Sequence, residues 1–261
     1  MLEHTRTGNG PPIVLMHGIG LDRRVWDPVV PLLAREHEVI AVDLPGFGES
    51  APLSGTPTVE ALAAAVEELG LERPHAVGNS LGGGIALELG RRGSAGSVCA
   101  ISPIGFAVAR ERTYARVTLD AVHAMATALD RRAETAYGGP ARRTALMAVV
   151  CSRPWKIPTE AAAHMNHCTA RAPGWRATLP AVTEWRPAMP PCPTTIAWAQ
   201  RDRLLLTGRQ APRARRRLPE ARHVILEGCG HVPMWDDPDL VVRTVLGVTT
   251  AHPSVREETS A

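Results

Sequence analysis

A G-x-S-x-G motif spans residues 78–82 and centres on Ser80. It follows an apolar run at 74–79 that is typical of a buried strand, and it precedes a helical pattern at 81–92. A serine on a sharp strand-to-helix turn has a strained backbone, and only neighbours without side chains leave room for it. The motif therefore predicts Ser80 as a nucleophile at the carboxyl end of a sheet.

A serine hydroxyl needs a base to take its proton, and the base needs a carboxylate to orient it. His231 lies in a glycine-rich loop directly after the strand expected at 223–227, and Asp202 follows the strand expected at 194–199. Loops that leave the same end of a parallel sheet converge. We therefore expect Ser80, Asp202 and His231 to form a catalytic triad, in the chain order Ser, Asp, His that an α/β-hydrolase would have.

The negative charge that develops during attack on a carbonyl requires N–H donors. One donor should be the N–H of Leu81, which begins the helix after the nucleophile. The second should come from the loop after the strand at 13–17, where the N–H of Ile19 is the best candidate. His17 precedes this loop, and we expect it to support the loop at the edge of the substrate pocket more than to transfer protons.

Short apolar runs alternate with helical patterns over the first hundred residues, stop, and resume near residue 194. This alternation predicts an α/β fold with a mostly parallel, doubly wound sheet. Further strands are expected at 38–43 and 97–102. Helices are expected at 27–35 with Asp27 as its cap, at 56–70, and from 237 onward.

Residues 104–190 show no strand pattern and several helical stretches broken by prolines, which predicts a helical cap inserted into the sheet domain. The expected division is therefore an α/β-hydrolase core at 1–103 and 191–248, a cap at 104–190, and a polar C-terminal tail at 249–261.

Four motifs in this order resemble those of the α/β-hydrolase fold family, in its cap-bearing group of esterases, lactonases, perhydrolases and carbon–carbon bond hydrolases. They are the His17-Gly18 loop, the D-x-P-G-x-G-x-S pattern at 43–50, the serine motif at 78–82 and the Gly-Cys-Gly-His loop at 228–231. The resemblance covers residues 1–248. It implies a serine hydrolase without a cofactor, and the serine excludes the dehalogenase and epoxide-hydrolase branches, which use aspartate.

The resemblance also implies a two-stranded hairpin at the start of the fold, but only residues 2–7 precede a Gly- and Pro-rich turn. The first edge strand is therefore expected to be missing.

The leading functional expectation is cleavage of a small apolar carboxylic ester or lactone through an acyl-enzyme. The Gly-Asn-Ser-Leu-Gly-Gly stretch at 78–83 also resembles carbon–carbon bond hydrolases, although Leu21 after Gly20 departs from their oxyanion loop. Perhydrolysis or another acyl transfer is a further alternative. Outside enzymes, the same fold can serve as a ligand-binding receptor with an idle triad.

Composition limits the other classes of function. The chain has 261 residues, 44% of them hydrophobic, and a net charge of +3, which excludes whole-chain disorder and gives no indication of nucleic-acid binding. No apolar run reaches the length of a membrane span, and no signal-peptide pattern opens the chain. Five widely spaced cysteines argue against a disulfide framework and a zinc knuckle. We expect a cytoplasmic enzyme with a small-molecule substrate, no membrane partner and no metal, and the oligomeric state stays open.

Aromatic residues make up only 4% of the chain, and six of the ten lie in the expected cap. Together they suggest an apolar or aromatic substrate pocket. The expected pocket residues are His17, Phe106, Trp155, Trp175 and Trp185, while Tyr114 and Tyr137 complete the group of cap aromatics.

Two weaker patterns favour structural roles. His164, His167 and Cys168 could share one helical face and present ligands to a metal, but cap packing is the better interpretation. The arginines at 213–217, beside Arg209, most simply form a solvated helical face instead of a nucleic-acid site.

Overall fold

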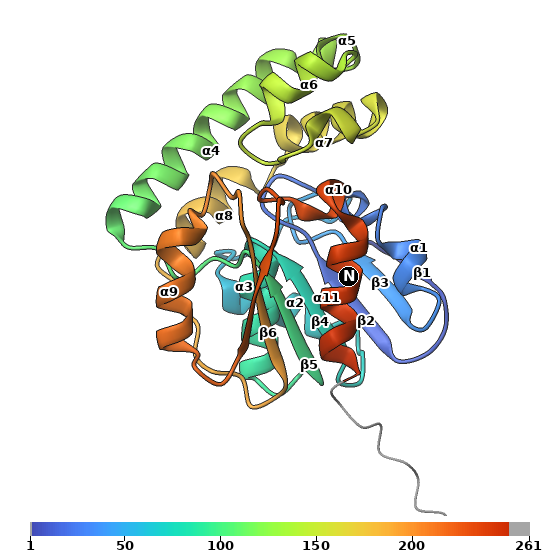
Figure 1. Cartoon of the computed structure of the whole chain (residues 1–261), viewed down its shortest axis with the longest axis vertical. Helices are drawn as coiled ribbons and strands as arrows, with labels where there is room; N and C mark the ends of the chain where they lie inside the picture. The colour runs from blue at the N-terminus through green and yellow to red at the C-terminus, as the bar shows by residue number, and fades with distance from the viewer. Residues whose placement is uncertain (1, 251–261) are drawn as a thin grey trace, which may run out of the picture.

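The computed structural model describes residues 2–250, which form a seven-stranded sheet flanked by helices (Figure 1). The strand order is β1-β3-β2-β4-β5-β6-β7, with β1 antiparallel to β3 and every other pairing parallel. This is the doubly wound sheet that the alternating patterns predicted. The strands are β1 (His4–Thr7), β2 (Pro12–Met16), β3 (Glu38–Val42), β4 (His75–Asn79), β5 (Ser97–Ile101), β6 (Thr194–Ala199) and β7 (Arg222–Leu226).

The central strands contribute side chains to two separate cores, because successive residues of a strand point to opposite faces of the sheet. In β2, Val14 and Met16 belong to one buried cluster, whereas Ile13 and Leu15 belong to the other. All four side chains are completely buried. Burial on both faces explains why such strands occur in the sequence as continuous apolar runs.

Helices cover both faces of the sheet. Helices α2 (Val59–Glu67), α3 (Leu81–Arg91) and α9 (Thr207–Arg217) pack on one face, and α1 (Val30–Leu33) and α11 (Pro238–Thr249) pack on the other. Both helical layers thus hold the strands whose ends carry the expected catalytic residues.

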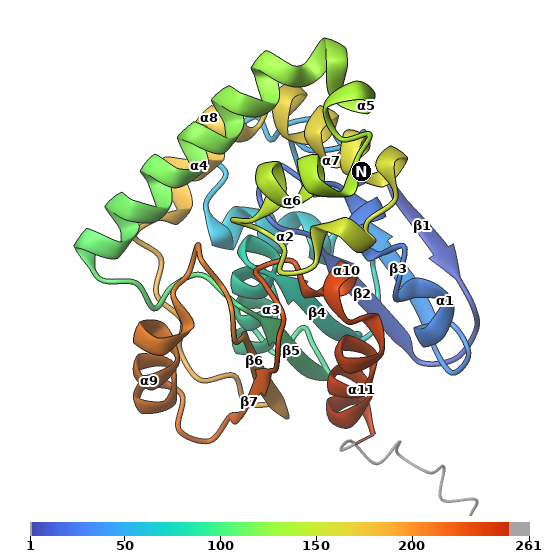
Figure 2. The ribbon, with the colours of Figure 1, turned by 45° about the horizontal axis from the view of Figure 1, so that its top comes forward.

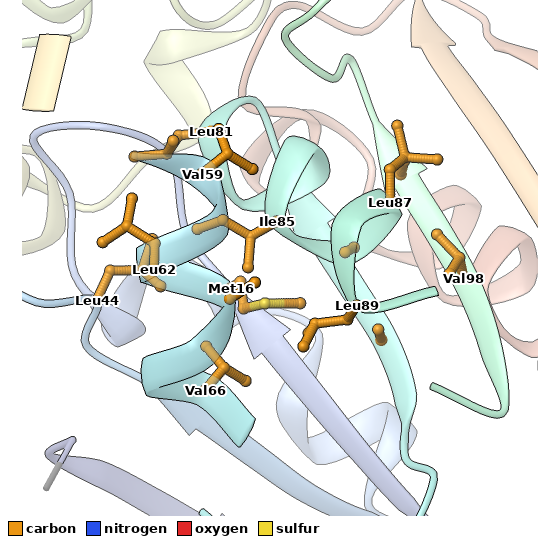
Figure 3. Packing of buried hydrophobic residues seen from close by; sticks show 14 of the residues in the cluster. Met16, Leu44, Val59, Leu62, Val66, Leu81, Ile85, Leu87, Leu89 and Val98 are labelled. Carbon is orange, nitrogen blue, oxygen red and sulfur yellow. The ribbon is translucent and has the colours of Figure 1, made fainter. Parts of the chain in front are cut away.

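The packing beneath α3 fixes the start of that helix. Figure 3 shows Leu62 of α2 and Ile85 of α3 in the same buried cluster as Met16 of β2. All three are fully buried, and each buried side chain of this size contributes roughly 1.5–3 kcal/mol to the free energy of unfolding. Because α3 begins directly after Ser80, this core holds the serine turn in place.

Residues 104–190 form a helical segment without strands between β5 and β6, drawn above the sheet in Figures 1 and 2. Its main helices, α4 (Ala109–Leu129) and α7 (Thr159–Arg171), pack against each other. Side chains from both line a cavity together with Ser80, which follows β4, so the segment lies over the carboxyl end of the sheet. The other elements are η2 (Asp130–Arg132), α5 (Ala133–Ala136), α6 (Pro140–Met147), η3 (Pro154–Lys156) and α8 (Trp175–Val182).

Backbone hydrogen bonds fasten the helical segment to loops of the sheet domain. The N–H of Val232 donates to the carbonyl of Val150 at 2.8 Å, and the N–H of Gly174 donates to the carbonyl of Gly46, also at 2.8 Å. The first bond lies next to His231, so the position of the expected catalytic histidine depends on the helical segment.

The prediction of a helix at 27–35 with Asp27 as its cap is wrong. The chain instead forms a 3-10 helix η1 (Arg23–Trp26) and a single turn, α1 (Val30–Leu33). In a helix beginning at residue 28, Pro31 would occupy the fourth position, whose N–H closes the first helical hydrogen bond. Proline has no N–H, so it fits only the first turn of a helix, as it does in α1.

The first element of the described chain is β1 and the last is α11. Among the described residues, one strand, β1, precedes the turn at 8–11 where the family resemblance implied two, and β1 therefore lies at the edge of the sheet. Helix α11 ends at Thr249, and the expected tail at 249–261 lies outside the described residues apart from its first two positions. Within residues 2–250, no helix combines the length and apolar character needed to cross a membrane.

Candidate active site

Ser80 has the strained backbone that the motif predicts. Its φ of 58° and ψ of −112° lie in a region that residues other than glycine rarely adopt. A Cβ atom at Gly78 would lie 2.0 Å from the carbonyl oxygen of Gly82, and one at Gly82 would lie 2.1 Å from that of Met16. Glycine is therefore required on both sides of the serine, for steric reasons.

The backbone of Ser80 is anchored on both sides, which offsets the strain. Its N–H donates to the carbonyl of Ile101 at 2.9 Å, and its carbonyl accepts from the N–H groups of Gly84 and Ile104 at 3.1 and 3.2 Å. Within the described residues, the Ser80 hydroxyl makes no hydrogen bond, and it borders a cavity. The side chain is therefore held in position with its oxygen free to react.

Asp202 and His231 form a buried pair. The Nδ1 atom of His231 lies 2.7 Å from Oδ2 of Asp202, and both side chains are at most 5% exposed. Oδ1 of Asp202 accepts from the N–H groups of Leu204 and Leu205, both at 2.8 Å. Burial alone would raise the pKa of Asp202, but the His231 charge and hydrogen bond and these two N–H groups outweigh burial, so the pKa is lowered.

An ionised Asp202 determines which ring nitrogen of His231 carries the proton. The carboxylate accepts a hydrogen bond from the Nδ1–H group, which leaves Nε2 without a hydrogen and available as a base. Ser80 and His231 line the same cavity, and no hydrogen bond joins them within the described residues. Such bonds are often long in an empty site and shorten when substrate binds.

Asn79 links the serine turn to the histidine loop. Its Nδ2 atom donates to the carbonyl of His231 at 2.9 Å and to that of Ile101 at 3.2 Å. The N–H of Arg201 also donates to the carbonyl of Cys229 at 2.8 Å, which ties the loop of the acid to that of the base. The three expected triad residues are therefore connected through neighbouring residues, and Asn79 is a positioning residue that the sequence pattern did not reveal.

Asp236 is a second positioning residue that sequence reasoning missed, because it resembles a helix-start aspartate. The side chain is 1% exposed. It accepts from the N–H of Gly230 at 2.7 Å and from the N–H groups of Ser152 and Arg153 at distances from 2.6 to 3.0 Å. One carboxylate thus joins the histidine loop to the helical segment.

The expected oxyanion donors are placed beside the serine. Within the described residues, the N–H groups of Ile19 and Leu81 have no hydrogen-bond partner, and both residues line a cavity with Ser80. A Cβ atom built on Gly18 would lie 3.3 Å from Cβ of Ser80, which shows how closely the two loops approach. Two unpaired N–H groups next to a free hydroxyl form the arrangement that an oxyanion hole requires.

His17 does not line the cavity, which corrects its expected place in the substrate pocket. Its side chain is fully buried, its Nδ1 donates to the carbonyl of Gly18 at 2.7 Å, and its Nε2 accepts from the N–H of Leu44 at 2.9 Å. Burial lowers the pKa of His17, so the ring stays neutral. Its place is consistent with the expected role of supporting the oxyanion loop.

Two largely apolar lobes meet at Ser80 and together form the candidate substrate cavity. Their linings are predominantly apolar, which suits the non-polar part of a small molecule. Ile19, Ser80, Leu119 and Leu204 line both lobes. We call them the inner lobe, with walls from α4, α6 and α7, and the outer lobe, with walls from α4, α8 and the loop after β5.

Trp175 lines the inner lobe, but the other expected pocket aromatics do not line either lobe. Phe106 packs edge to face on Trp198, with ring centroids 5.9 Å apart. Trp185 packs over the glycines at 84 and 105, and Trp155 is 49% exposed on η3. The aromatic lining predicted from composition is therefore wrong for Phe106, Trp155 and Trp185, because these rings fill gaps or face solvent.

Aliphatic and methionine side chains line the inner lobe instead. From α4 come Leu119, Val122 and Ala126, at the i, i+3 and i+7 positions of one helical face. That spacing was visible in the sequence, but no pattern showed that this face covers a cavity. Further lining residues include Met125, Leu146, Met147 and Met165.

The structure places His164, His167 and Cys168, which were expected to share one helical face, in two separate clusters. His167 pairs with Asp130 at 2.7 Å, while His164 and Cys168 meet Asp22. The three donor atoms of this second cluster lie within 4.8 Å of one another, so it is a place where described residues could hold a metal ion.

In this second cluster, the ring nitrogens of His164 and the carboxylate of Asp22 already have hydrogen-bond partners. Arg24 donates to Nδ1 of His164 at 3.3 Å, so Nε2 carries the proton and donates to Oδ2 of Asp22 at 2.6 Å. Burial acts to raise the pKa of Asp22, but the bond to His164 outweighs it and the pKa is lowered. The cluster fastens α7 to the loop that follows β2.

Fold and site together define a class of protein. A serine on a strand-to-helix turn, a buried aspartate–histidine pair and two free N–H groups at the carboxyl end of a doubly wound sheet are the features of an α/β hydrolase. Residues 13–244 match the family model described as "Alpha/beta hydrolase family". The chain belongs to this family, which confirms the resemblance seen in the sequence.

Relatives of known name include an esterase. The pimeloyl-[acyl-carrier protein] methyl ester esterase of Aeromonas hydrophila subsp. hydrophila is 45% identical over 86 residues, which cover 32% of this chain and 34% of the relative. The dihydrolipoyllysine-residue acetyltransferase component of the acetoin cleaving system of Cupriavidus necator is 38% identical over 112 residues, covering 40% of this chain and 30% of the relative. The alignments thus span about a third of each relative.

Solved structures share the fold over nearly the whole chain. A thermophilic esterase from Thermogutta terrifontis has a TM-score of 0.73 at 23% identity, with 96% of this chain and 93% of that chain covered. The enol-lactonase from Burkholderia xenovorans LB400 has a TM-score of 0.61 at 23% identity, with 95% and 96% covered. At these identities the likeness extends to the fold alone.

Proposed function

We propose that the protein is a serine hydrolase that cleaves a small apolar carboxylic ester or lactone. The observation that carries the proposal is the buried 2.7 Å contact between Asp202 and His231 on the same cavity as the strained Ser80. The pimeloyl-[acyl-carrier protein] methyl ester esterases among its relatives support ester hydrolysis as the reaction.

The proposed reaction begins when Nε2 of His231 takes the proton of the Ser80 hydroxyl and the serine oxygen attacks the substrate carbonyl. The N–H groups of Ile19 and Leu81 stabilise the oxyanion, and Asp202 stabilises the imidazolium. His231 then gives its proton to the leaving alkoxide, and an acyl-enzyme forms. Water, activated by His231, releases the acid and restores the serine.

In this proposal the helical segment at 104–190 acts as a cap that selects the substrate. Apart from the loops after the strands, most of the cavity wall comes from α4, α6, α7 and α8, and it is predominantly apolar. Such walls favour acyl or alkyl groups over charged ones close to the serine. No cofactor enters this reaction scheme.

The five cysteines support a reducing compartment, and we keep the cytoplasm as the proposed location. All five are free thiols, and Cys99, Cys151 and Cys229 are buried. Proteins of oxidising compartments more often use such residues in disulfides.

The first test is labelling with a fluorophosphonate probe, followed by peptide mapping. We expect the probe to modify Ser80, and Ser80→Ala to lose labelling and to reduce kcat by several orders of magnitude, about 10⁴-fold or more. Ser54→Ala, at an exposed serine, is the matched control and should keep full activity. A loss below tenfold in Ser80→Ala would contradict the proposal.

A substrate panel then separates the alternatives that share this triad. It comprises p-nitrophenyl esters of increasing acyl length, lactones and a dienone-type diketone. Preference for esters or lactones supports the proposal. Cleavage of the diketone alone would establish a carbon–carbon bond hydrolase instead, and peracid formation with hydrogen peroxide at a rate above hydrolysis would indicate a perhydrolase.

A further inference from the structure

The outer lobe ends at positively charged side chains. Close to Ser80 its walls are apolar and include Ile104, Leu179 and Val182, whereas Arg112 and Arg116 of α4 also line it. A surface groove continues from this lobe, because Gly105, Ala107 and Arg112 line both. The path from the serine therefore runs along apolar side chains to a cationic exit.

The groove is strongly basic. Five arginines from α4, α9 and the loop after α8 line it, and none of its lining residues is a carboxylate. Two neighbouring carboxylates provide partial neutralisation, since Glu184 pairs with Arg112 and Arg186, and Glu111 pairs with Arg213. The groove arginines are Arg112, Arg186, Arg213, Arg216 and Arg217.

Several of these guanidinium groups retain unused donors. Within the described residues, Arg216 has no hydrogen-bond or ion-pair partner, and Arg217 uses only its Nε, which donates to the carbonyl of Pro187 at 2.6 Å. The pKa of Arg186 is lowered, first by burial and then by the positive charges of Arg112 and Arg217. The groove thus has a surplus of positive charge that an anion would relieve.

The position of the arginines favours a small anionic group over a polyanion. Arg213, Arg216 and Arg217 of α9 line the groove beside the lobe, while Arg209 and Arg215 of the same helix do not. A nucleic acid would need basic side chains spread over a surface that follows its backbone, whereas these converge on the exit of a cavity. Guanidinium forks bind carboxylate and phosphate groups through paired hydrogen bonds.

We infer that the substrate carries an anionic group, a carboxylate or a phosphate, at the far end of an apolar chain attached to the ester or lactone. The apolar chain lies in the outer lobe and the anion lies in the arginine groove. This inference rests on the proposed function for the position of the ester at Ser80, and on the lobe and groove for the rest. The groove is then a specificity site that acts on substrate binding.

The test compares three p-nitrophenyl esters of equal acyl length that end in a methyl, a carboxylate or a phosphate group. For the wild type we expect kcat/KM to be about tenfold or more higher for at least one anionic ester than for the methyl-ended ester, and raising the salt to about 0.5 M should reduce this preference. The identity of the preferred ester distinguishes carboxylate from phosphate.

The double variant Arg216→Gln/Arg217→Gln should remove the preference by raising KM for the anionic ester about tenfold, with kcat for every ester and KM for the methyl-ended ester unchanged. Arg215→Gln, on the same helix but outside the groove, is the matched control and should behave as wild type. Equal kcat/KM for the three esters in the wild type, or a double variant that affects all esters alike, would overturn the inference.

Calorimetry separates a failure of this inference from a failure of the proposed function. Suberate, an eight-carbon α,ω-dicarboxylate, octyl phosphate and the uncharged control 1-octanol are titrated into Ser80→Ala, which needs no catalysis. Binding of suberate or octyl phosphate that weakens in the Arg216/Arg217 double variant supports the groove as an anion site even if no ester is cleaved. Equal binding of all three ligands to both proteins would contradict it.

Discussion

At the scale of single residues, the site depends on a few residues that are held in place by hydrogen bonds to backbone groups. Ser80 is strained but anchored through three backbone hydrogen bonds, and Asp202 accepts two N–H groups besides the bond to His231. These residues could be predicted because each follows a strand, and parallel strands bring their carboxyl ends together.

Other residues at the site could not be predicted in this way. Asn79 and Asp236 hold the loops of the proposed triad together through bonds to backbone groups far away in the sequence. Such bonds have no local motif. Trp155 and Trp185 were misplaced for a related reason, since composition indicates where aromatic rings are abundant but not which way they point.

Asp202→Asn tests the role of the acid. Asparagine can still accept from Leu204 and Leu205 through its oxygen, so we expect the fold to persist. Its amide nitrogen would face Nδ1 of His231 as a donor and favour the tautomer with the proton on Nε2, which cannot act as a base. The expected loss in kcat is on the order of 10³- to 10⁴-fold at unchanged circular dichroism. Activity within tenfold of the wild type would mean that another acid orients His231.

At the scale of elements, the strand positions expected from the sequence lie within a residue or two of those in the structure, because buried parallel strands have continuous apolar runs. The helix at 27–35 failed because Pro31 outweighed the capping signal of Asp27 and Pro28. The helical segment at 104–190 was predicted as a block, but its cavity-facing sides were not. Helix α4 packs against α7, and this packing decides which face of α4 is covered.

Asp236→Ala tests how the helical segment positions the histidine loop. Removal of this buried carboxylate leaves the N–H groups of Gly230, Ser152 and Arg153 without their acceptor, so the free energy of unfolding should fall by about 3 kcal/mol or more. Because the histidine loop loses its attachment, kcat should fall as well. Urea unfolding and ester kinetics measure both effects.

Asp239→Ala, at an exposed aspartate in the first turn of α11, is the control for this experiment; it should leave kcat unchanged and lower the free energy of unfolding by less than about 1 kcal/mol. If Asp236→Ala unfolds too readily to assay, Asp236→Asn retains one oxygen and should show an intermediate loss of both. Wild-type stability in Asp236→Ala would show that water satisfies the three N–H groups instead.

At the scale of the whole molecule, two cores on opposite faces of one sheet support loops that all converge on its carboxyl end. The mostly parallel, doubly wound sheet follows from the alternation of strand and helix patterns, which is why the sequence could predict it. The arginine groove could not be predicted, although the run at 213–217 was visible. Only the folded structure places part of α9 beside α4 and the outer lobe. The net charge of the whole chain, +3, also does not reveal a local excess of positive charge.

The response of global stability to pH should reveal the neutral, buried His17. Its pKa is lowered by burial in the folded protein and returns to about 6.5 on unfolding. Below that value the unfolded chain binds a proton that the folded protein excludes, because Nε2 accepts from Leu44 and a protonated ring would place two donors against each other. Stability is therefore complete above pH 6.5 and decreases as the pH falls toward the folded pKa.

Urea unfolding at about pH 7.5, 6.5 and 5.5 measures this effect, with a slope of at most about 1.4 kcal/mol per pH unit for one proton. His17→Gln can still accept from Leu44 and donate to Gly18, so it should be less stable at neutral pH but show a flatter slope over this range. An unchanged slope in His17→Gln would assign the acid sensitivity to another group and remove His17 as the residue whose neutrality holds the loop after β2.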